Sequence, residues 1–307
     1  MRRTCLDSVY RLAKEDPRIV FIGSDLGSGT LDAFKREMPE RFFMEGISEA
    51  HVVGMAAGMA LEGRIVYLNT IATFLTRRCY EQVVLDLCLH RARVRLIGSG
   101  GGLVYAPLGP THEAIEDVAI LRPLPGMRIL APADAEEMAR IMPHTVEPEG
   151  PIYIRLGKGG DPVVTDPAQP FRWGMPALLR PGRGILLITT GTAAGLVLEA
   201  AARLAAAGHD PAVLHLPCLK PIHLEALRAH LAPMGTVVTV EEHVVTGGLG
   251  SLVAEVLAET PFPVPKRFRR VGLGDAFPEG YGSQASLMGM CGVSAEAVVS
   301  TVLGLLA

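Results

Sequence analysis

The alternating pattern of this chain begins at residues 18–24, which read RIVFIGS. A short run of β-branched and aromatic residues that closes on Gly-Ser predicts a buried strand followed by a turn. A helical pattern then extends to about Glu37, and Pro39 ends it. Similar apolar runs recur through the first half of the chain, at residues 41–45, 64–69, 93–98, 128–131 and 152–155. Because helix-length segments separate these runs, they predict a mostly parallel sheet with helices on both faces.

A stretch rich in glycine and proline divides the chain. Proline and glycine interrupt residues 161–182 repeatedly, which predicts a linker between domains. After it the alternation resumes, with expected strands at residues 185–190, 211–216, 236–241 and 268–272. The sequence therefore predicts two consecutive α/β domains with mostly parallel sheets, over residues 1–160 and 183–307.

The composition narrows the functional class. The 307 residues are 49% hydrophobic and 20% charged, which is too apolar for a disordered chain. The net charge of −3 gives no basic excess for nucleic acid or for an anionic membrane. Asp7 and residues 14–16 interrupt the apolar core that a signal peptide needs, and the five cysteines have no C-x-x-C spacing. We therefore expect a reduced cytoplasmic protein that has neither a disulfide framework nor a zinc site.

The most unusual segment is residues 45–58, EGISEAHVVGMAAG. It places a carboxylate, Glu49, at the start of a helix that is otherwise apolar and made of small residues. Glu49 is either a partner of the helix dipole or a carboxylate held in a dry site with a raised pKa. The pattern alone leaves both interpretations open and favours the first.

Two further segments carry polar groups beside predicted helices. Residues 73–82, TFLTRRCYEQ, are also compatible with a solvated helix start whose aromatic side chains face the core. Residues 108–117, LGPTHEAIED, place His112 just before a helix, where it can donate into a cleft. The glycine-rich run 98–102 lacks the spacing of a nucleotide-binding loop. Among the other histidines, His51 and His243 are those that could face a cleft.

Taken together, these segments resemble transketolase. The motifs Asp-Leu, Gly-Ile-Ser-Glu, Thr-Phe-Leu, Gly-Pro-Thr-His and Pro-Ala-Asp occur in that family's order and spacing, at residues 25–26, 46–49, 73–75, 109–112 and 132–134. Residues 216–222 and 240–250 are similar to the same family and to its relative, deoxyxylulose-phosphate synthase. The resemblance implies a thiamine-diphosphate-binding pyrimidine domain followed by a transketolase C-terminal domain.

The resemblance also implies roles for particular residues. Glu49 matches the carboxylic acid that lies beside N1′ of the cofactor's aminopyrimidine, which favours its imino tautomer. His112 matches a histidine that reaches the reacting oxygen of the substrate, so these two residues are the expected catalytic pair. The expected cofactor-binding residues are Asp25, Glu49, Phe74 and Tyr80. The expected substrate-binding residues are Ser28, Leu108, His112 and Arg155, of which Arg155 matches an arginine that binds a sugar phosphate.

Several positions depart from the family pattern. Leu108 stands where an aspartate usually contacts a substrate hydroxyl, and Gly100 stands near the place of a phosphate-binding histidine. Gly29 replaces a phosphate-contacting serine, although Ser28 adjoins it, and Arg77 stands where an aromatic residue commonly lies. These departures predict a ketose that is less polar or differently charged than an ordinary pentose phosphate.

The chain lacks the motif that anchors the cofactor's diphosphate. Family members bind the metal through Gly-Asp-Gly followed by a distant Asn, and residues 274–276, Gly-Asp-Ala, do not match it. The resemblance therefore implies that a separate, N-terminal-type transketolase subunit carries the diphosphate-binding domain and the Mg²⁺ ligands, with none in this chain. Because the family's cofactor lies across a subunit interface, the expected assembly is an α2β2 heterotetramer.

The implied function is transfer of a two-carbon ketol unit from a ketose or ketose-phosphate donor to an aldose acceptor. The alternatives are the β-subunit of a 2-oxo-acid dehydrogenase, an enzyme like deoxyxylulose-phosphate synthase, and a non-catalytic assembly partner. The Gly-Pro-Thr-His motif at residues 109–112 argues against the dehydrogenase. The joint presence of Glu49, Phe74 and His112 argues against a non-catalytic chain.

Overall fold

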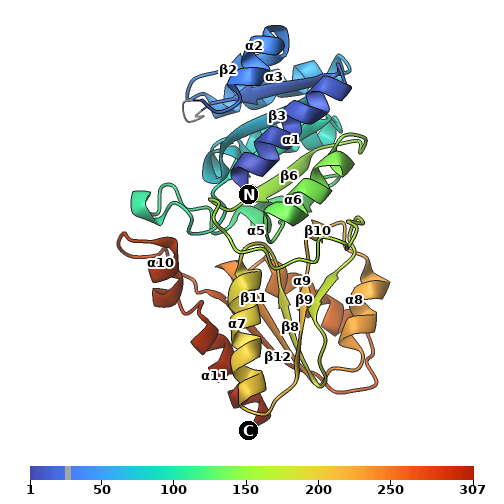
Figure 1. Ribbon diagram of the computed structural model, residues 1–307, viewed down its shortest axis with the longest axis vertical. Coiled ribbons are helices and arrows are strands. Elements are labelled where there is room, and N and C mark those ends of the chain that lie inside the picture. Colours follow the sequence, from blue (N-terminus) through green and yellow to red (C-terminus); the bar gives the residue numbers. More distant parts are fainter. Residues whose placement is uncertain (25–28) are drawn as a thin grey trace.

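A computed structural model describes residues 1–24 and 29–307. The chain folds into two α/β domains that lie end to end, the first blue to green and the second yellow to red in Figure 1. The N-terminus lies near the junction of the two domains, and the C-terminus lies at the far end of the second domain. The α/β class and the mostly parallel sheets agree with the sequence prediction.

The first sheet has seven strands in the order β10-β5-β6-β4-β3-β1-β2. Its strands are β1 (Ile19–Gly23), β2 (Phe42–Met44), β3 (Ile65–Ile71), β4 (Val94–Ser99), β5 (Arg128–Leu130), β6 (Ile152–Leu156) and β10 (Cys218–Lys220). Neighbouring strands are parallel, except that β10 runs antiparallel to β5. Every residue of β4 and β6 is buried, as expected for central strands that are covered on both faces.

Helices cover both faces of this sheet. They are α1 (Arg2–Glu15), α2 (Asp32–Glu37), η1 (Pro39–Arg41), α3 (Glu49–Leu61), η2 (Phe74–Arg78), α4 (Tyr80–Gln82), η3 (Val83–Leu89), η4 (Ala106–Leu108), α5 (Asp117–Leu121), α6 (Ala135–Ile141) and η5 (Met142–Thr145). Helices α1 and α6 share one apolar cluster with the sheet, and α3, η3 and α5 share another. Asp134 caps α6, since its carboxylate accepts from the Glu137 N–H at 2.8 Å, as is typical where Asp is followed three residues later by Glu.

The second sheet has five strands in the order β12-β11-β8-β9-β7. Its strands are β7 (Ala177–Arg180), β8 (Ile185–Thr189), β9 (Pro211–His215), β11 (Thr236–Val244) and β12 (Arg267–Leu273). Its helices are α7 (Ala193–Ala206), α8 (Leu224–Leu231), α9 (Leu249–Glu259), α10 (Gln284–Met290) and α11 (Ala295–Leu306). Helices α7 and α11 pack on one face, whereas α8 and α9 join an apolar cluster that continues into the first domain.

Two strands, β7 and β10, differ from the sequence prediction. Residues 161–182 were expected to be irregular, but β7 lies within them and pairs antiparallel with β9. The strand is short, lies at an edge and is flanked by prolines, so the sequence pattern does not reveal it. In addition, β10 leaves the second domain and completes the first sheet beside β5. The two domains therefore share a sheet edge as well as an apolar cluster.

One stretch, Gln284–Leu306, is long and apolar enough to cross a membrane when judged by length and composition alone. Only 22% of its most apolar 18-residue segment is buried in the protein. The stretch is divided between α10 and α11, and Gly292 has a left-handed φ of 76° in the connecting turn. It therefore forms two short helices on the second domain and not one continuous span.

Candidate active site

The expected site residues gather at one edge of the first sheet. Glu49 begins α3 shortly after β2, Phe74 follows β3, and His112 lies in the long connection after β4. Because these three strands are parallel, their carboxyl ends meet at the same edge. In α/β sheets this edge is the usual place for a ligand.

Glu49 is buried and paired with an arginine. Its side chain is 3% exposed, and its Oε2 accepts from Nη1 of Arg78 at 2.7 Å. The N-terminal position on α3 adds a favourable interaction with the helix dipole. The Glu49 carboxylate thus lies at a helix start and is buried beside a cation.

Arg78 and His112 lie against different parts of one aromatic ring. The Arg78 guanidinium carbon lies 4.1 Å from the centre of the Phe74 ring, and the His112 ring meets Phe74 edge-on with centroids 5.2 Å apart. Phe74 and Arg78 belong to a π-helical segment, η2, of the kind that is frequent at functional sites. Glu49, Arg78, Phe74 and His112 therefore form one continuous set of contacts.

The neighbouring Arg77 binds two residues that follow His112 in the chain. Its Nε lies 3.0 Å from Oε1 of Glu116, and its Nη2 donates to the Glu113 carbonyl at 3.0 Å. Burial raises the pKa of Glu116, and the charge of Arg77 partly offsets this. Arg77 thus ties the η2 segment to the chain just after His112.

A cavity of about 580 Å³ lies beside the ion pair of Arg77 and Glu116. Arg77, Ile115 and Glu116 line it from the first domain, and residues 244–246 and 273–277 line it from the second. Its walls mix apolar side chains with a few polar groups, as small-molecule sites do. The cavity is therefore bounded by both domains and adjoins the η2 segment through Arg77, although Glu49, Phe74 and His112 do not line it.

The other predicted site residues have different surroundings. The Tyr80 hydroxyl donates to the Ile120 carbonyl at 2.8 Å, and Leu108 is half exposed at the end of η4. Asp25 and Ser28 lie outside the described residues. The expected roles of these four residues stay predictions.

Arg155 lies in a buried ionic cluster, away from solvent. Its Nε donates to Oδ2 of Asp117 at 2.8 Å, and its Nη2 donates to the carbonyls of Ala114 and Glu242. The Asp117 and Glu242 carboxylates raise the pKa of Arg155 although burial opposes this. The guanidinium is thus engaged by residues of both domains, and its expected contact with a sugar phosphate stays a prediction.

The same cluster contains His243, which the sequence left as a candidate for the cleft. The side chain is 2% exposed, and its Nε2 accepts from the Ala119 N–H at 3.2 Å. Burial lowers the pKa of His243 to about 4, so the ring is neutral near pH 7. His243 therefore belongs to the contact between the domains.

Three acidic residues that were not predicted as site residues are buried here: Glu113, Asp117 and Glu242. Both carboxylate oxygens of Glu113 lack a hydrogen-bond partner among the described residues, and burial raises its pKa. Acidic residues in the Gly-Pro-Thr-His segment and in the Glu241-Glu242-His243 run are the only sequence signal for this cluster.

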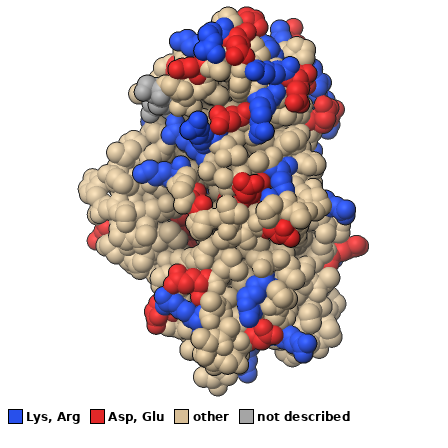
Figure 2. Space-filling model, in the orientation of Figure 1, with Lys and Arg blue, Asp and Glu red and all other residues tan. Residues whose placement is uncertain are grey.

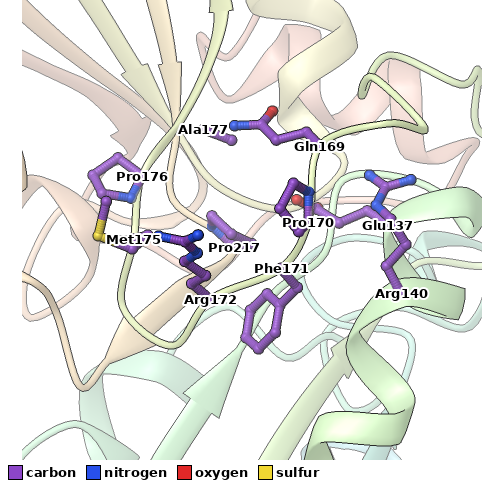
Figure 3. A pocket seen from close by; sticks show the side chains of 10 residues that line it. All are labelled: Glu137, Arg140, Gln169, Pro170, Phe171, Arg172, Met175, Pro176, Ala177 and Pro217. Carbon is purple, nitrogen blue, oxygen red and sulfur yellow. The ribbon is translucent and has the colours of Figure 1, made fainter.

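A second cavity, of about 220 Å³, lies at the junction of the domains and is shown in Figure 3. Its walls come from α6, from residues 169–177 and from Pro217. Two of its residues, Arg140 and Arg172, carry guanidinium groups, whereas the Glu137 carboxylate accepts from the Ala133 N–H. None of the predicted site residues lines this cavity.

The part of the chain at residues 1–24 and 29–307 contains no cluster of three or more His, Cys, Asp or Glu side chains arranged to hold a metal ion.

Comparison with known families identifies both domains. The pyrimidine-binding domain of transketolase matches residues 1–160, and the transketolase C-terminal domain matches residues 174–298. The fold and these two matches thus define an α/β protein built from transketolase-type domains, and the chain belongs to the transketolase family. Membership of this family implies thiamine diphosphate as the cofactor.

Individual relatives cover almost the whole chain. An apulose-4-phosphate transketolase subunit of Phocaeicola vulgatus is 34% identical over 304 residues, which is 98% of this chain and 96% of that protein. A solved structure described as a split gene transketolase, inactive beta4 tetramer, is 37% identical, has a TM-score of 0.90 and is covered over 97% of its length. The 1-deoxy-D-xylulose-5-phosphate synthase of Heliobacterium modesticaldum is 36% identical over 295 residues, but the match covers only 45% of that protein.

Proposed function

We propose that this chain is the subunit of a split transketolase that supplies the pyrimidine-binding and C-terminal domains. With a partner chain, it transfers a two-carbon ketol unit from a ketose or ketose phosphate to an aldose. The observation that carries this proposal is the continuous contact from Glu49 through Arg78 and Phe74 to His112. This contact joins the expected cofactor-binding carboxylate to the expected substrate-binding histidine at the ligand edge of the sheet.

The surroundings of Phe74 and Glu49 fit the pyrimidine end of thiamine diphosphate. The Arg78 guanidinium is a flat, nitrogen-containing group that lies on the Phe74 ring and donates to Glu49. An aminopyrimidine is also flat and also presents ring nitrogen to a carboxylic acid. Arg78 therefore marks a place where such a ring would meet the same two partners.

In this proposal each residue has a defined task. Glu49 shares a proton with a ring nitrogen, Phe74 packs against the ring, and Tyr80 and Asp25 complete the pocket. When bound, thiamine diphosphate supplies the electron sink that carbon–carbon cleavage requires.

His112 donates a hydrogen bond to the reacting oxygen of the substrate. Its Nδ1 lies 2.9 Å from the Thr111 hydroxyl, which leaves Nε2 as the group that can meet the substrate. We place Ser28, Leu108 and Arg155 on the substrate side of the site. Leu108 and Arg77 favour a donor that is less polar or differently charged than an ordinary pentose phosphate, and Arg77 is already bound to Glu116.

The partner supplies the diphosphate-binding domain and the Mg²⁺ ligands in an α2β2 heterotetramer. Large apolar side chains are exposed near the site, among them Ile47, Leu108, Phe277 and Tyr281. On the face shown in Figure 2, the bulge beside α10 is nearly free of charged side chains, whereas charges of both signs are scattered elsewhere. Such a surface suits burial against another subunit.

We also place the assembled enzyme in the cytoplasm. All five cysteines are free thiols, and four of them are buried. This supports a reducing compartment.

The deciding experiment is reconstitution with a chain that carries the Gly-Asp-Gly…Asn motif. We expect saturable binding of thiamine diphosphate by the pair in the presence of Mg²⁺, and at most weak binding by this chain alone. A screen of ketose donors with aldehyde acceptors then identifies the substrate. Tight, Mg²⁺-dependent binding by this chain alone would contradict the two-chain assignment.

A second candidate function is condensation like that of deoxyxylulose-phosphate synthase. The 36% identity to that enzyme from Heliobacterium modesticaldum favours it. The reconstituted pair distinguishes the two reactions when it is supplied with pyruvate or hydroxypyruvate as the donor. Turnover of pyruvate with release of CO₂, and none of hydroxypyruvate or ketoses, would favour the condensation.

A further inference from the structure

The loop that carries His112 is closed at its base by a narrow neck. The Gly102 N–H donates to the Ala114 carbonyl at 2.8 Å, and the Ala114 N–H donates back to the Gly102 carbonyl at 3.0 Å. His112 lies only two residues before Ala114. The placement of His112 against Phe74 therefore depends on how firmly this neck is held.

A carboxylate from the second domain holds the neck. Oε1 of Glu242, on β11, accepts from the Leu103 N–H at 2.6 Å. Gln284, at the start of α10, donates to both oxygens of the same carboxylate at 2.9 Å. A Cβ at Gly102 would lie 2.6 Å from Glu242 Oε1, so the chain approaches the carboxylate as closely as a glycine allows.

The opposite side of the neck is held through the same residue. Nη2 of Arg155 donates to the Glu242 carbonyl at 3.0 Å and to the Ala114 carbonyl at 3.3 Å. The Glu242 side chain thus holds one strand of the neck, whereas the other strand shares Arg155 with the main-chain carbonyl of Glu242. Glu242 is 3% exposed, so no water competes strongly for these hydrogen bonds.

The second domain also packs directly on the loop. Leu103, Ala106 and Ile115 form an apolar cluster with Leu273, Leu287 and Val293 of the second domain. In Figure 1 the teal loop lies next to α10 across the domain junction. Without Glu242, this cluster still attaches the loop, but no directional bond fixes the Leu103 amide.

We propose that Glu242 is a positioning residue for His112: it holds the base of the His112 loop, and through it the distance between His112 and Phe74. The inference rests on the proposed function only for its catalytic consequence. The statement that Glu242 holds the base of the loop concerns this chain alone and is tested on the isolated chain.

The first experiment measures amide hydrogen exchange in the isolated chain. Glu242→Ala leaves the buried Leu103 amide without its acceptor, and we expect exchange at Gly102, Leu103 and Ala114 to accelerate by roughly tenfold or more. Glu242→Gln keeps one acceptor oxygen but has no charge, so we expect a smaller acceleration. It also provides a folded variant if the alanine variant does not fold.

The matched control is Glu255→Gln. Glu255 also joins the two domains, through an ion pair with Arg122 at 2.5 Å, but it does not touch the loop. We expect unchanged exchange at the neck in this variant. Equal exchange at the neck in the wild type and in Glu242→Gln, or equal acceleration in Glu255→Gln, would overturn the inference.

The second experiment uses the reconstituted pair with thiamine diphosphate, Mg²⁺ and hydroxypyruvate as the donor. In Glu242→Gln we expect kcat to fall by about tenfold or more, whereas the Kd of the cofactor stays within about twofold, because Glu49 and Phe74 are untouched. A parallel loss of cofactor affinity would show a general structural role and would overturn the positioning assignment. If the wild-type pair turns over no donor, the proposed function fails, while the exchange experiment still decides the role of Glu242.

Discussion

The Arg78 guanidinium donates to the Glu49 carboxylate at 2.7 Å, although the Arg78 side chain is 45% exposed and the Glu49 side chain is only 3% exposed. A half-exposed cation thus reaches inward to a buried carboxylate at the start of α3. The same guanidinium covers the Phe74 ring. In the isolated chain, the two groups expected to receive the cofactor's pyrimidine are both in contact with Arg78.

Replacing Glu49 should strongly reduce turnover without unfolding the chain. We expect Glu49→Gln to lower kcat of the reconstituted pair by about 100-fold or more, since the amide cannot share a proton as the carboxylic acid does. The control is Glu62→Gln at the exposed, opposite end of the same helix, which should retain full activity. Steady-state kinetics of the three pairs provide the measurement, and near-full activity of Glu49→Gln would end the catalytic assignment.

Replacing Arg78 should have opposite effects on stability and on cofactor binding. Arg78→Ala leaves the Glu49 carboxylate without its charged partner, which we expect to cost the isolated chain about 1–3 kcal/mol in denaturant unfolding. In the pair, the vacated Phe74 face should bind thiamine diphosphate more tightly. Arg91→Ala, which breaks an exposed pair with Glu149, should cost less than about 1 kcal/mol and leave binding unchanged. Weaker cofactor binding by Arg78→Ala would show that Arg78 contributes to the site.

The buried His243 should make the chain sensitive to acid. Its folded pKa of about 4 lies below the unfolded value of about 6.5, so the unfolded chain binds more protons between these pH values. The stabilisation by neutral His243 is therefore complete above pH 6.5 and is lost as the pH falls toward 4. The loss amounts to about 3 kcal/mol.

The difference in unfolding free energy between the wild type and His243→Gln, measured from pH 4 to pH 7.5, isolates this contribution. Asp117, Arg155 and Glu241 face the imidazole in both proteins, so their own titration largely cancels. We expect the difference to shrink as the pH falls. A difference that is constant with pH would show that His243 does not titrate in this range.

Adding a methyl group at Gly102 should destabilise the chain by two mechanisms. Gly102 has a φ of 70°, and its Cβ would meet Glu242 Oε1 at 2.6 Å. Gly160 has a φ of 81° and no atom within 4 Å of its Cβ position, so Gly160→Ala measures the backbone cost alone. We expect about 1 kcal/mol for Gly160→Ala and an additional 1–3 kcal/mol, roughly, for Gly102→Ala. Equal losses in thermal or denaturant unfolding would mean that the Glu242 contact is not rigid.

Most of the strands could be predicted from the sequence, because a buried parallel strand is a continuous apolar run between turn residues. The runs at residues 152–155 and 185–190, for example, correspond to β6 and β8. The predictions failed for β7 and β10, which have four and three residues. Prolines flank both of these edge strands and read as turns, whereas the equally short edge strand β2 lies within a run, residues 41–45, that could be predicted.

The candidate site also contains some residues that the sequence reveals and others that it does not. Glu49 and His112 could be proposed from the local motifs in which they occur. Arg78 could not, because its pairing with Glu49 joins segments that are 29 residues apart. Glu242 lies 139 residues from Leu103, and Arg155, which the family resemblance assigned to a sugar phosphate, lies beside Asp117 in the contact between the domains.

The order of residues along the chain was enough to establish the family, the alternation of strands and helices, and the identity of the expected catalytic pair, because these depend on local patterns and spacing. Folding in three dimensions added the shared sheet edge of the two domains, the buried charges between them and the carboxylate that holds the His112 loop. Such contacts form only when distant segments exclude water together. Their energies come from desolvation and from hydrogen bonds between residues that lie far apart in the sequence, so no local sequence pattern reveals them.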